Sequence, residues 1–503
     1  METELKFQIP PARSAALRRA LATASARSVR LQALYADTAD QRLAAAGLAL
    51  RLRKEGRVWV QTLKGRGDGL MRRLEHEVHL PPQRGVPMLD PQRHAGTPVG
   101  ELLAVALASG AELRTLYQTD IRRLHRRVRH GGAVIEIAYD HGRIVADGRS
   151  VAADEIEFEL VSGPPAALPA RAARWAARFG LWWDVRTKSE RGFRLALGHD
   201  QVPAVKANAA ALPAVAGPHQ AWCTVLQSAL AQALPNAAEI AAGTDTPEHL
   251  HQLRVALRRL RSALRWFAVW GGDAEAAHAL EADWREPFGR LGAARDSDVL
   301  VHCLQPALQA AGAPPFDATP AAADGGPGEI VRGVEFPGLL LRTLAITWPP
   351  PQPVDDGGSA ALDAAARDVL RRAWRRVLKD AQGFGTASVD EQHRMRKRLK
   401  RFRYGLEFLM PLLAHKPARR LHRAACTALD ALGHLNDLHT AEAYFRTCAQ
   451  SDARAWFAVG WVAGSQPQAR AVAARALARM ARLDASPLPW RRRGQRRQRK
   501  SSA

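Results

Sequence analysis

Apolar and charged residues alternate in short stretches throughout the first 200 residues. At the start of the chain, Leu5, Phe7 and Ile9 would lie on one face of a strand, and Glu2, Glu4 and Lys6 on the other. Similar alternation returns at residues 48–53, 58–64, 73–80, 117–128, 133–140 and 154–160. A single such stretch would fit a solvated edge strand, but its recurrence predicts about eight strands that share a charged face.

Other segments between these strands predict helices and turns. Residues 12–24 and 166–179 are helix-like, and residues 43–47 form a short helical segment that Gly47 could end. The sequence Tyr35-Ala-Asp-Thr is interpreted as a turn signal.

The charges on the shared strand face are of both signs, and a closed antiparallel barrel with a polar interior would house them. Carboxylates at close quarters repel one another, and a divalent cation such as Mg²⁺ or Mn²⁺ removes that cost. Arginine and lysine in the same interior would bind phosphate. The interior therefore predicts a site for a metal and a polyphosphate; the alternative is a sheet whose surface charges neutralise one another.

Six motifs in this half resemble the CYTH superfamily of triphosphate tunnel metalloenzymes. They are Glu2-x-Glu4-x-Lys6, Tyr35-x-Asp37-Thr38, Gly47-Leu-Ala-Leu-Arg51-x-Arg53, Gln61-Thr-Leu-Lys64, the Glu155/Glu157/Glu159 strand and Lys188-Ser-Glu-Arg191-Gly. The resemblance covers residues 1–199 and implies an active enzyme. It implies metal ligands at Glu2, Glu4, Glu157 and Glu159, assisted by Asp140 and by Glu75 or Glu77. It implies triphosphate contacts from Lys6, Arg51, Arg53, Lys64, Arg73, Arg123 and Lys188, with Arg123 preferred to Arg122. Glu4, Lys6 and Lys64 are the expected catalytic residues, with Lys6 acting as a base or an electrophile.

The second half predicts an all-helical domain at residues 218–485, after a linker rich in Ala and Pro at residues 200–217. It contains an internal repeat: the spacing of His251, Arg254, Arg258 and Arg261 returns in His393, Arg396, Lys400 and Arg403. At 3.6 residues per turn each set lies on one helix face. We expect the two basic faces to pair about a pseudo-two-fold axis and to form one groove. Each copy is followed by a segment containing Asp296 or Asp437, interpreted as a loop.

A basic helix face is usually only solvated, but the repetition favours anion binding. Without an adjacent carboxylate pair, His251 and His393 are expected to donate hydrogen bonds to phosphate; metal ligation and phosphoryl acceptance remain alternatives. Aromatic residues are not interleaved with the bases, which disfavours nucleic acid. This half resembles the CHAD domain, a family associated with inorganic polyphosphate. The resemblance implies that this half binds polyphosphate.

The amino-acid composition narrows the possible partners and the cellular location of the protein. Lys and Arg number 73 against 49 Asp and Glu, a net charge of +24, which favours a polyanionic partner. Four scattered cysteines predict a reducing cytoplasm, and the sequence predicts no membrane span. The tail at residues 486–503, with seven bases between Arg491 and Lys500, is expected to be disordered.

Together these features predict an α+β multidomain protein that hydrolyses inorganic triphosphate in the cytoplasm, with polyphosphate as a partner of the helical domain and granule association as a possible consequence. A binding protein without turnover and a class IV-like adenylate cyclase are the alternatives. Thiamine triphosphate is a further candidate substrate.

Overall fold

The computed structural model describes residues 2–67, 71–108, 110, 112–199, 201–213, 216–299, 304–316, 325–348 and 358–483, with the side chains of 293–299 and 305 left aside. Its internal contacts divide it into two compact units. One contains Met1–Lys206, Leu230–Leu253 and Gly326–Pro349; the other contains Ala207–Ala229, Arg254–Gly325 and Pro350–Ala503. Among the described residues, no helix is both long enough and apolar enough to cross a bilayer.

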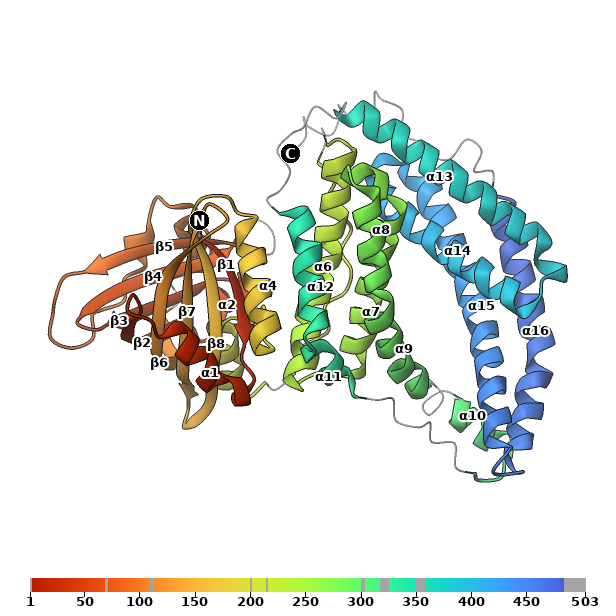
Figure 1. Cartoon of the computed structure of the whole chain (residues 1–503), viewed down its shortest axis with the longest axis horizontal. Coiled ribbons are helices and arrows are strands. Elements are labelled where there is room, and N and C mark those ends of the chain that lie inside the picture. Colours follow the sequence, from red (N-terminus) through yellow and green to blue (C-terminus); the bar gives the residue numbers. More distant parts are fainter. Residues whose placement is uncertain are drawn as a thin grey trace. The chain divides into compact units, whose positions relative to one another are not determined.

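The N-terminal half of the chain forms a closed antiparallel barrel of eight strands (Figure 1). The spatial order is β5-β4-β3-β2-β6-β7-β8-β1, and pairing of β1 with β5 closes the ring; the two-residue β9 adds to the edge of β1. The strands are β1 (Glu2–Gln8), β2 (Arg27–Thr38), β3 (Ala49–Glu55), β4 (Val58–Arg66), β5 (Arg72–Leu80), β6 (Leu113–His130), β7 (Ala133–Ala146), β8 (Arg149–Ser162) and β9 (Trp182–Trp183). The predicted eight-stranded barrel is confirmed.

The turn interpretation of Tyr35-Ala-Asp-Thr is wrong, because these residues end β2. The alternation from Val29 through Leu31 to Tyr35 already carried the strand signal. Asp37 does organise the next segment: its carboxylate accepts hydrogen bonds from the backbone N–H groups of Leu43 at 2.9 Å and Ala44 at 3.0 Å. This fixes the start of the short helix that follows β2.

Helices cover parts of the outside of the barrel: α1 (Pro11–Leu21), α2 (Arg42–Ala45), η1 (Pro91–His94), α3 (Pro98–Ala106) and α4 (Ala167–Phe179). Helix α5 (Lys188–Leu197) instead packs against apolar residues of the inner face through Phe193, Leu195 and Ala196. The apolar face of β1 and β8 points outward, where Phe158 packs edge-on against Phe7 and against Trp175 of α4. The opposite, charged face of the same strands therefore points into the barrel.

The C-terminal half is helical, as predicted. Its helices are α6 (Pro218–Ala242), α7 (Pro247–Trp266), η2 (Ala268–Gly271), α8 (Ala274–Asp283), α9 (Arg285–Val299), α10 (Gln305–Ala310), α11 (Pro327–Arg332), α12 (Glu335–Thr347), α13 (Gly358–Gly383), η4 (Phe384–Thr386), α14 (Val389–Leu409), η5 (Met410–Leu412), α15 (His415–Cys448) and α16 (Ala455–Ala481). The expected loops around Asp296 and Asp437 are wrong, since both residues lie within helices, α9 and α15.

Several predictions about this half remain open. The two-fold arrangement of the repeat and the domain boundaries 1–199 and 218–485 stay predictions. The basic tail at 486–503 lies outside the described residues. The predicted linker has no helix or strand over residues 201–213. It is nevertheless anchored, because Val205 exchanges backbone hydrogen bonds with the Asn236 side chain at 3.1 and 2.9 Å.

Candidate functional site

A row of carboxylates crosses three neighbouring strands inside the barrel. Glu159 on β8 pairs in register with Glu4 on β1 and with Glu136 on β7. Burial, together with Glu2, Glu136 and Glu4, raises the pKa of Glu159 to about 7. Crowding of like charges at this place makes it costly to keep every carboxylate ionised without a cation.

Basic side chains partly offset this acidic row. Lys64 of β4 contacts Glu2 at 2.7 Å and Glu75 at 3.1 Å, while Arg73 of β5 contacts Glu4 at 3.3 Å. Burial still raises the pKa of Glu2, against the opposing effect of Lys64. Arg127 also contacts Glu136 at 3.2 Å, and His125 lies 3.1 Å from the same carboxylate. Five glutamates of this group therefore face three lysine or arginine side chains, which leaves the group with more negative than positive charge.

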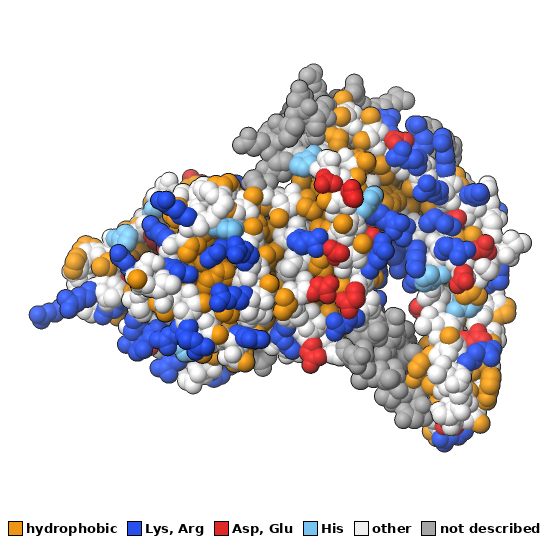
Figure 2. Space-filling view, in the orientation of Figure 1, with side chains coloured by type: hydrophobic (Ala, Val, Ile, Leu, Met, Phe, Trp, Pro, Cys, Tyr) orange, Lys and Arg blue, Asp and Glu red, His pale blue; other side chains and the backbone are white. Residues whose placement is uncertain are grey.

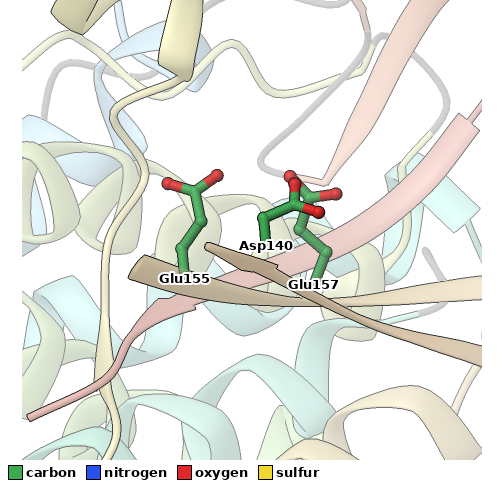
Figure 3. Close-up of side chains that lie close together, drawn as sticks. All are labelled: Asp140, Glu155 and Glu157. Atoms are coloured by element: carbon green, nitrogen blue, oxygen red, sulfur yellow. The ribbon is translucent and has the colours of Figure 1, made fainter. Parts of the chain in front are cut away.

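A second acidic group lies further along the same strands. Asp140, Glu155 and Glu157 point to the same side of β7 and β8, and each offers an oxygen within 4.8 Å of the others (Figure 3). Lys188, the first residue of α5, contacts them at 2.6, 2.5 and 2.8 Å respectively. Arg123 forms a bidentate pair with Asp140, both hydrogen bonds being 2.7 Å long. Here the carboxylates are matched by bases, which lower the pKa of Asp140 and Glu157 despite burial.

Lys6 joins these groups from β1. Its side chain is 6 % exposed and its ammonium lies 4.0 Å from Glu155. The ammonium donates a hydrogen bond to the backbone carbonyl of Arg186. The position of Lys6 thus depends on the segment between β9 and α5.

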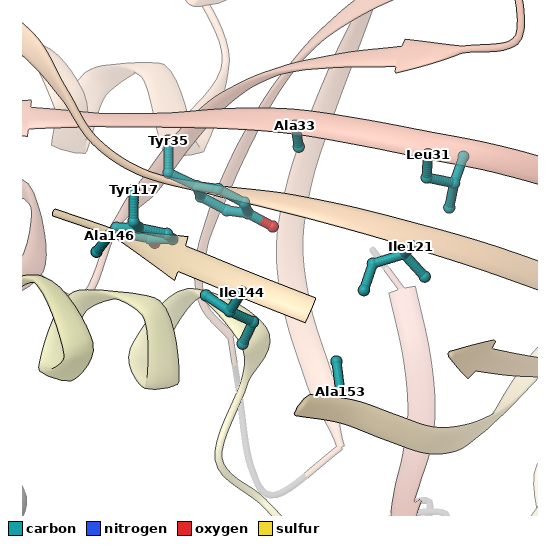
Figure 4. Close-up of a cluster of buried hydrophobic side chains, with 8 residues drawn as sticks. All are labelled: Leu31, Ala33, Tyr35, Tyr117, Ile121, Ile144, Ala146 and Ala153. Atoms are coloured by element: carbon teal, nitrogen blue, oxygen red, sulfur yellow. The ribbon is translucent and has the colours of Figure 1, made fainter. Parts of the chain in front are cut away.

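Arginines of β3 complete the charged interior. Arg51 donates to the Tyr35 hydroxyl at 3.1 Å, and Arg53 contacts Glu77 at 3.2 Å as well as Glu55. Tyr35 stacks on Tyr117 with centroids 4.7 Å apart. The two rings belong to an apolar cluster on the same inner face (Figure 4), formed with Leu31, Ala33, Ile121, Ile144, Ala146 and Ala153. Part of the interior is therefore packed and part is polar.

The acidic row is one candidate for holding a divalent cation; among the described residues, the carboxylates that lie within 4.8 Å of one another are Asp140, Glu155 and Glu157. Glu2, Glu4, Glu136 and Glu159 supply hard carboxylate oxygens of the type that Mg²⁺ and Mn²⁺ prefer. The raised pKa values of Glu2 and Glu159 mark the place where added positive charge would relieve repulsion most. Asp140 and Glu157 already have basic partners, so they need a cation less.

The structure brings the barrel residues expected from the sequence into one interior. Arg123 contributes to it, whereas Arg122 pairs in register with Arg30 on the outer face. Sequence reasoning left Glu136 and Glu155 out of the expected site, although each is in phase with an included residue. It missed Asp184 and Arg186 altogether, since they lie in an irregular segment without periodicity.

A second candidate site lies on the helices of the other unit. The guanidinium groups of Arg254, Arg258 and Arg261 on α7 approach the Phe288 ring of α9, 5.0–5.6 Å from its centre. In Figure 2, Lys and Arg side chains gather in the hollow between α7 and the pair α14–α15. The first basic set is therefore held on an aromatic support.

The second basic set lies near the first. Burial and the neighbouring Arg258, Arg396 and Arg403 lower the pKa of Lys400 to about 6, against the opposing effect of Asp437. Arg258 comes from α7 and Lys400 from α14, so the two sequence motifs meet in space. His393 forms a 2.7 Å hydrogen bond with Asn436 of α15. His251 lies half-buried on α7, in the barrel unit.

Comparisons with known proteins place both halves in families. The CYTH domain model matches residues 1–179 and the CHAD domain model matches residues 224–446. An inorganic triphosphatase from Haemophilus influenzae is 26% identical over 161 residues, 32% of this chain and 44% of that protein. The chain therefore matches less than half the length of that relative.

Two solved structures are also similar. The CHAD domain from the plant Ricinus communis is 26% identical, with a TM-score of 0.46, covering 56% of this chain and 96% of that one. HpAC1 from Hippeastrum, reported to have a dominant triphosphatase activity, is 22% identical with a TM-score of 0.29, covering 39% of this chain and 96% of that one. On the match of the two family models, the chain carries a CYTH domain at residues 1–179 and a CHAD domain at residues 224–446.

Proposed function

We propose that the barrel hydrolyses inorganic triphosphate, or a related triphosphate, with Mg²⁺ or Mn²⁺. The observation that carries this proposal is a closed barrel whose interior holds an acidic row next to a set of buried bases. The acidic row would hold a cation, and the buried bases would bind a triphosphate. The curated relative is itself named an inorganic triphosphatase.

Each part of the interior has a role in this mechanism. Glu2, Glu4 and Glu159 would hold the cation, with Glu75, Glu77, Asp140 and Glu157 assisting. A bound cation supplies neutralisation of phosphate oxygens and an activated water. Lys6, Arg51, Arg53, Lys64, Arg73, Arg123 and Lys188 bind and orient the substrate. They also stabilise the charge that develops on the leaving phosphate.

The bases are already held in position before substrate arrives. Lys188 and Arg123 rest on Asp140 and Glu157, and Lys64 rests on Glu2. Their charged state is secured, since the carboxylates raise the pKa of Lys188 and Lys64 despite burial. A triphosphate would therefore meet bases that are charged and oriented, which reduces the cost of reorganisation.

The test is phosphate release from inorganic triphosphate, ATP and long-chain polyphosphate, each with Mg²⁺, Mn²⁺ or EDTA. We expect metal-dependent release from triphosphate well above that from ATP. Glu4→Gln should lower kcat by roughly 10²–10³-fold without unfolding the barrel. Glu101→Gln, at an exposed position on α3, is the matched control. Turnover that survives EDTA or Glu4→Gln would refute the mechanism.

We also propose that the helical domain binds inorganic polyphosphate through Arg254, Arg258, Arg261, Arg396, Lys400 and Arg403, with His251 and His393 donating hydrogen bonds. The meeting of the two basic sets around Lys400 supports this. The protein would then act in the cytoplasm, in association with polyphosphate. Tight polyphosphate binding without hydrolysis of any substrate would favour a pure binding protein, and release of pyrophosphate from ATP would favour a cyclase.

A further inference from the structure

The segment between β9 and α5 ties Lys6 and Lys188 to each other. Asp184, fully buried, accepts hydrogen bonds from Gln8 of β1 at 3.0 Å and from the Arg186 guanidinium at 2.9 and 3.0 Å. Its own N–H donates to the Lys6 carbonyl at 3.1 Å. Arg186 in turn provides the carbonyl that holds the Lys6 ammonium, and Lys188 follows two residues later.

A carboxylate from the CHAD domain holds this segment from the other side. Glu239 of α6, 2 % exposed, contacts Arg186 at 3.5 Å and Arg194 of α5 at 2.7 Å. The Thr244 hydroxyl donates to the same carboxylate at 2.5 Å. Glu239 thus reaches both ends of the segment that carries Lys188, and all of these residues belong to the barrel unit.

Such a buried ionic network does little for stability, since desolvation offsets much of its attraction. Apolar packing of α12 against α4 is available to hold the helices on the barrel. The buried ion network around Glu239 is better suited to fixing the position of the segment between β9 and α5 against α6.

We propose that Glu239 of the CHAD domain is a positioning residue for Lys6 and Lys188, so that the helical half completes the barrel interior. This rests on the proposed function for its consequence in catalysis, but not for its geometry. Loss of the Glu239 charge removes one of the two carboxylates that contact the Arg186 guanidinium and leaves Asp184 as the other, so the carbonyl that holds Lys6 is held less firmly. Because misplacement of about 1 Å can cost 10²-fold in rate, we expect Glu239→Gln to lower kcat/KM for triphosphate by roughly 10-fold or more.

The deciding measurement does not depend on turnover. The full-length, unliganded chain is treated with a small amine-reactive reagent, and labelling of each lysine is followed by mass spectrometry. We expect Lys6 and Lys188 to label several-fold faster in Glu239→Gln, with exposed Lys397 as the internal reference. Asp380→Asn, which breaks the bidentate pair with Arg398 in the other unit, is the matched control and should leave both rates unchanged.

Unchanged labelling of Lys6 and Lys188 in Glu239→Gln overturns the positioning role, even if activity falls. Faster labelling supports it, whether or not the wild-type chain hydrolyses triphosphate; absence of hydrolysis would instead refute the proposed function. A double variant with Lys6→Ala adds a kinetic check, because residues acting through one another are non-additive. If Glu239→Gln does not fold, Thr244→Val removes a donor to the same carboxylate and takes its place.

Discussion

At the scale of single residues, Glu159 is the carboxylate of the barrel interior whose ionised form is most costly without a cation. Its pKa of about 7 lies above the 4.5 of an ordinary glutamate, owing to burial and to Glu2, Glu136 and Glu4. A carboxyl with a raised pKa in the folded state contributes stability below pH 4.5, and that contribution is lost as the pH rises through about 7.

The effect of Glu159→Gln on stability should therefore depend on pH. In EDTA at pH 8 the variant should be more stable than wild type by roughly 1 kcal/mol, after discounting for solvent screening. At pH 4.5 the difference should vanish. Thermal unfolding at both pH values measures it, with Glu101→Gln as the surface control. Added Mg²⁺ should reverse the order at pH 8, and a variant already less stable there in EDTA would contradict the prediction.

Lys400 carries the opposite shift in the helical domain. Its pKa of about 6 means that it is neutral at pH 7.5, and its contribution to stability, which is full above pH 10.5, declines as the pH is lowered and is gone below about 6. A bound polyanion would restore its charge. We therefore expect polyphosphate binding at pH 7.5 to take up close to one proton, and affinity to rise by up to ~10-fold per pH unit between pH 8 and 6.

Calorimetry in two buffers of different ionisation enthalpy measures this proton uptake. The comparison is with Lys400→Met, in which the uptake due to Lys400 disappears. Lys397→Met, one turn away and exposed, should keep it. Equal uptake in wild type and Lys400→Met would refute the assignment.

At the scale of elements, α5 matters because Lys188 begins it. A Cβ added at Gly192 would lie 2.2 Å from the Tyr117 ring, so the helix fits only with glycine there. Gly192→Ala should push α5 outward, cost about 1–3 kcal/mol and lower triphosphatase activity. Gly433→Ala in α15, where the added Cβ meets nothing within 4 Å, is the control. Unfolding curves and kcat/KM test both variants, and a fully active, equally stable Gly192→Ala would contradict the packing argument.

The sequence predicted individual strands and helices better than the contacts between them. Alternation revealed most strands of the barrel, because the charged inner face and the apolar outer face differ sharply. The prediction misses β2 although Val29, Leu31 and Tyr35 alternate with polar residues, because Tyr35-Ala-Asp-Thr is interpreted as a turn signal. The pairing of Glu4 with Glu159, or the contact of Glu239 with Arg186, depends on residues far apart in the chain. No local pattern predicts those contacts.

At the scale of the whole molecule, the charge of +24 makes attraction of polyanions general, whatever the site. Specific binding by the two basic sets must therefore be separated from this background. Raising the salt concentration separates the two kinds of binding, because salt screens diffuse attraction between exposed charges more than it screens contacts at a partly buried site.

Arg254→Ala combined with Arg396→Ala should weaken polyphosphate binding by roughly 10-fold or more at 150 mM salt. Arg371→Ala combined with Arg375→Ala removes the same charge from exposed positions on α13. It should change affinity only slightly, and only at low salt. Titrations of both double variants and wild type from 50 to 500 mM salt measure this difference. If both weaken binding equally, net charge alone recruits polyphosphate and the basic sets have no special role. If only the first does, while hydrolysis of triphosphate is unchanged in both, the two halves of the chain bind separate phosphate ligands.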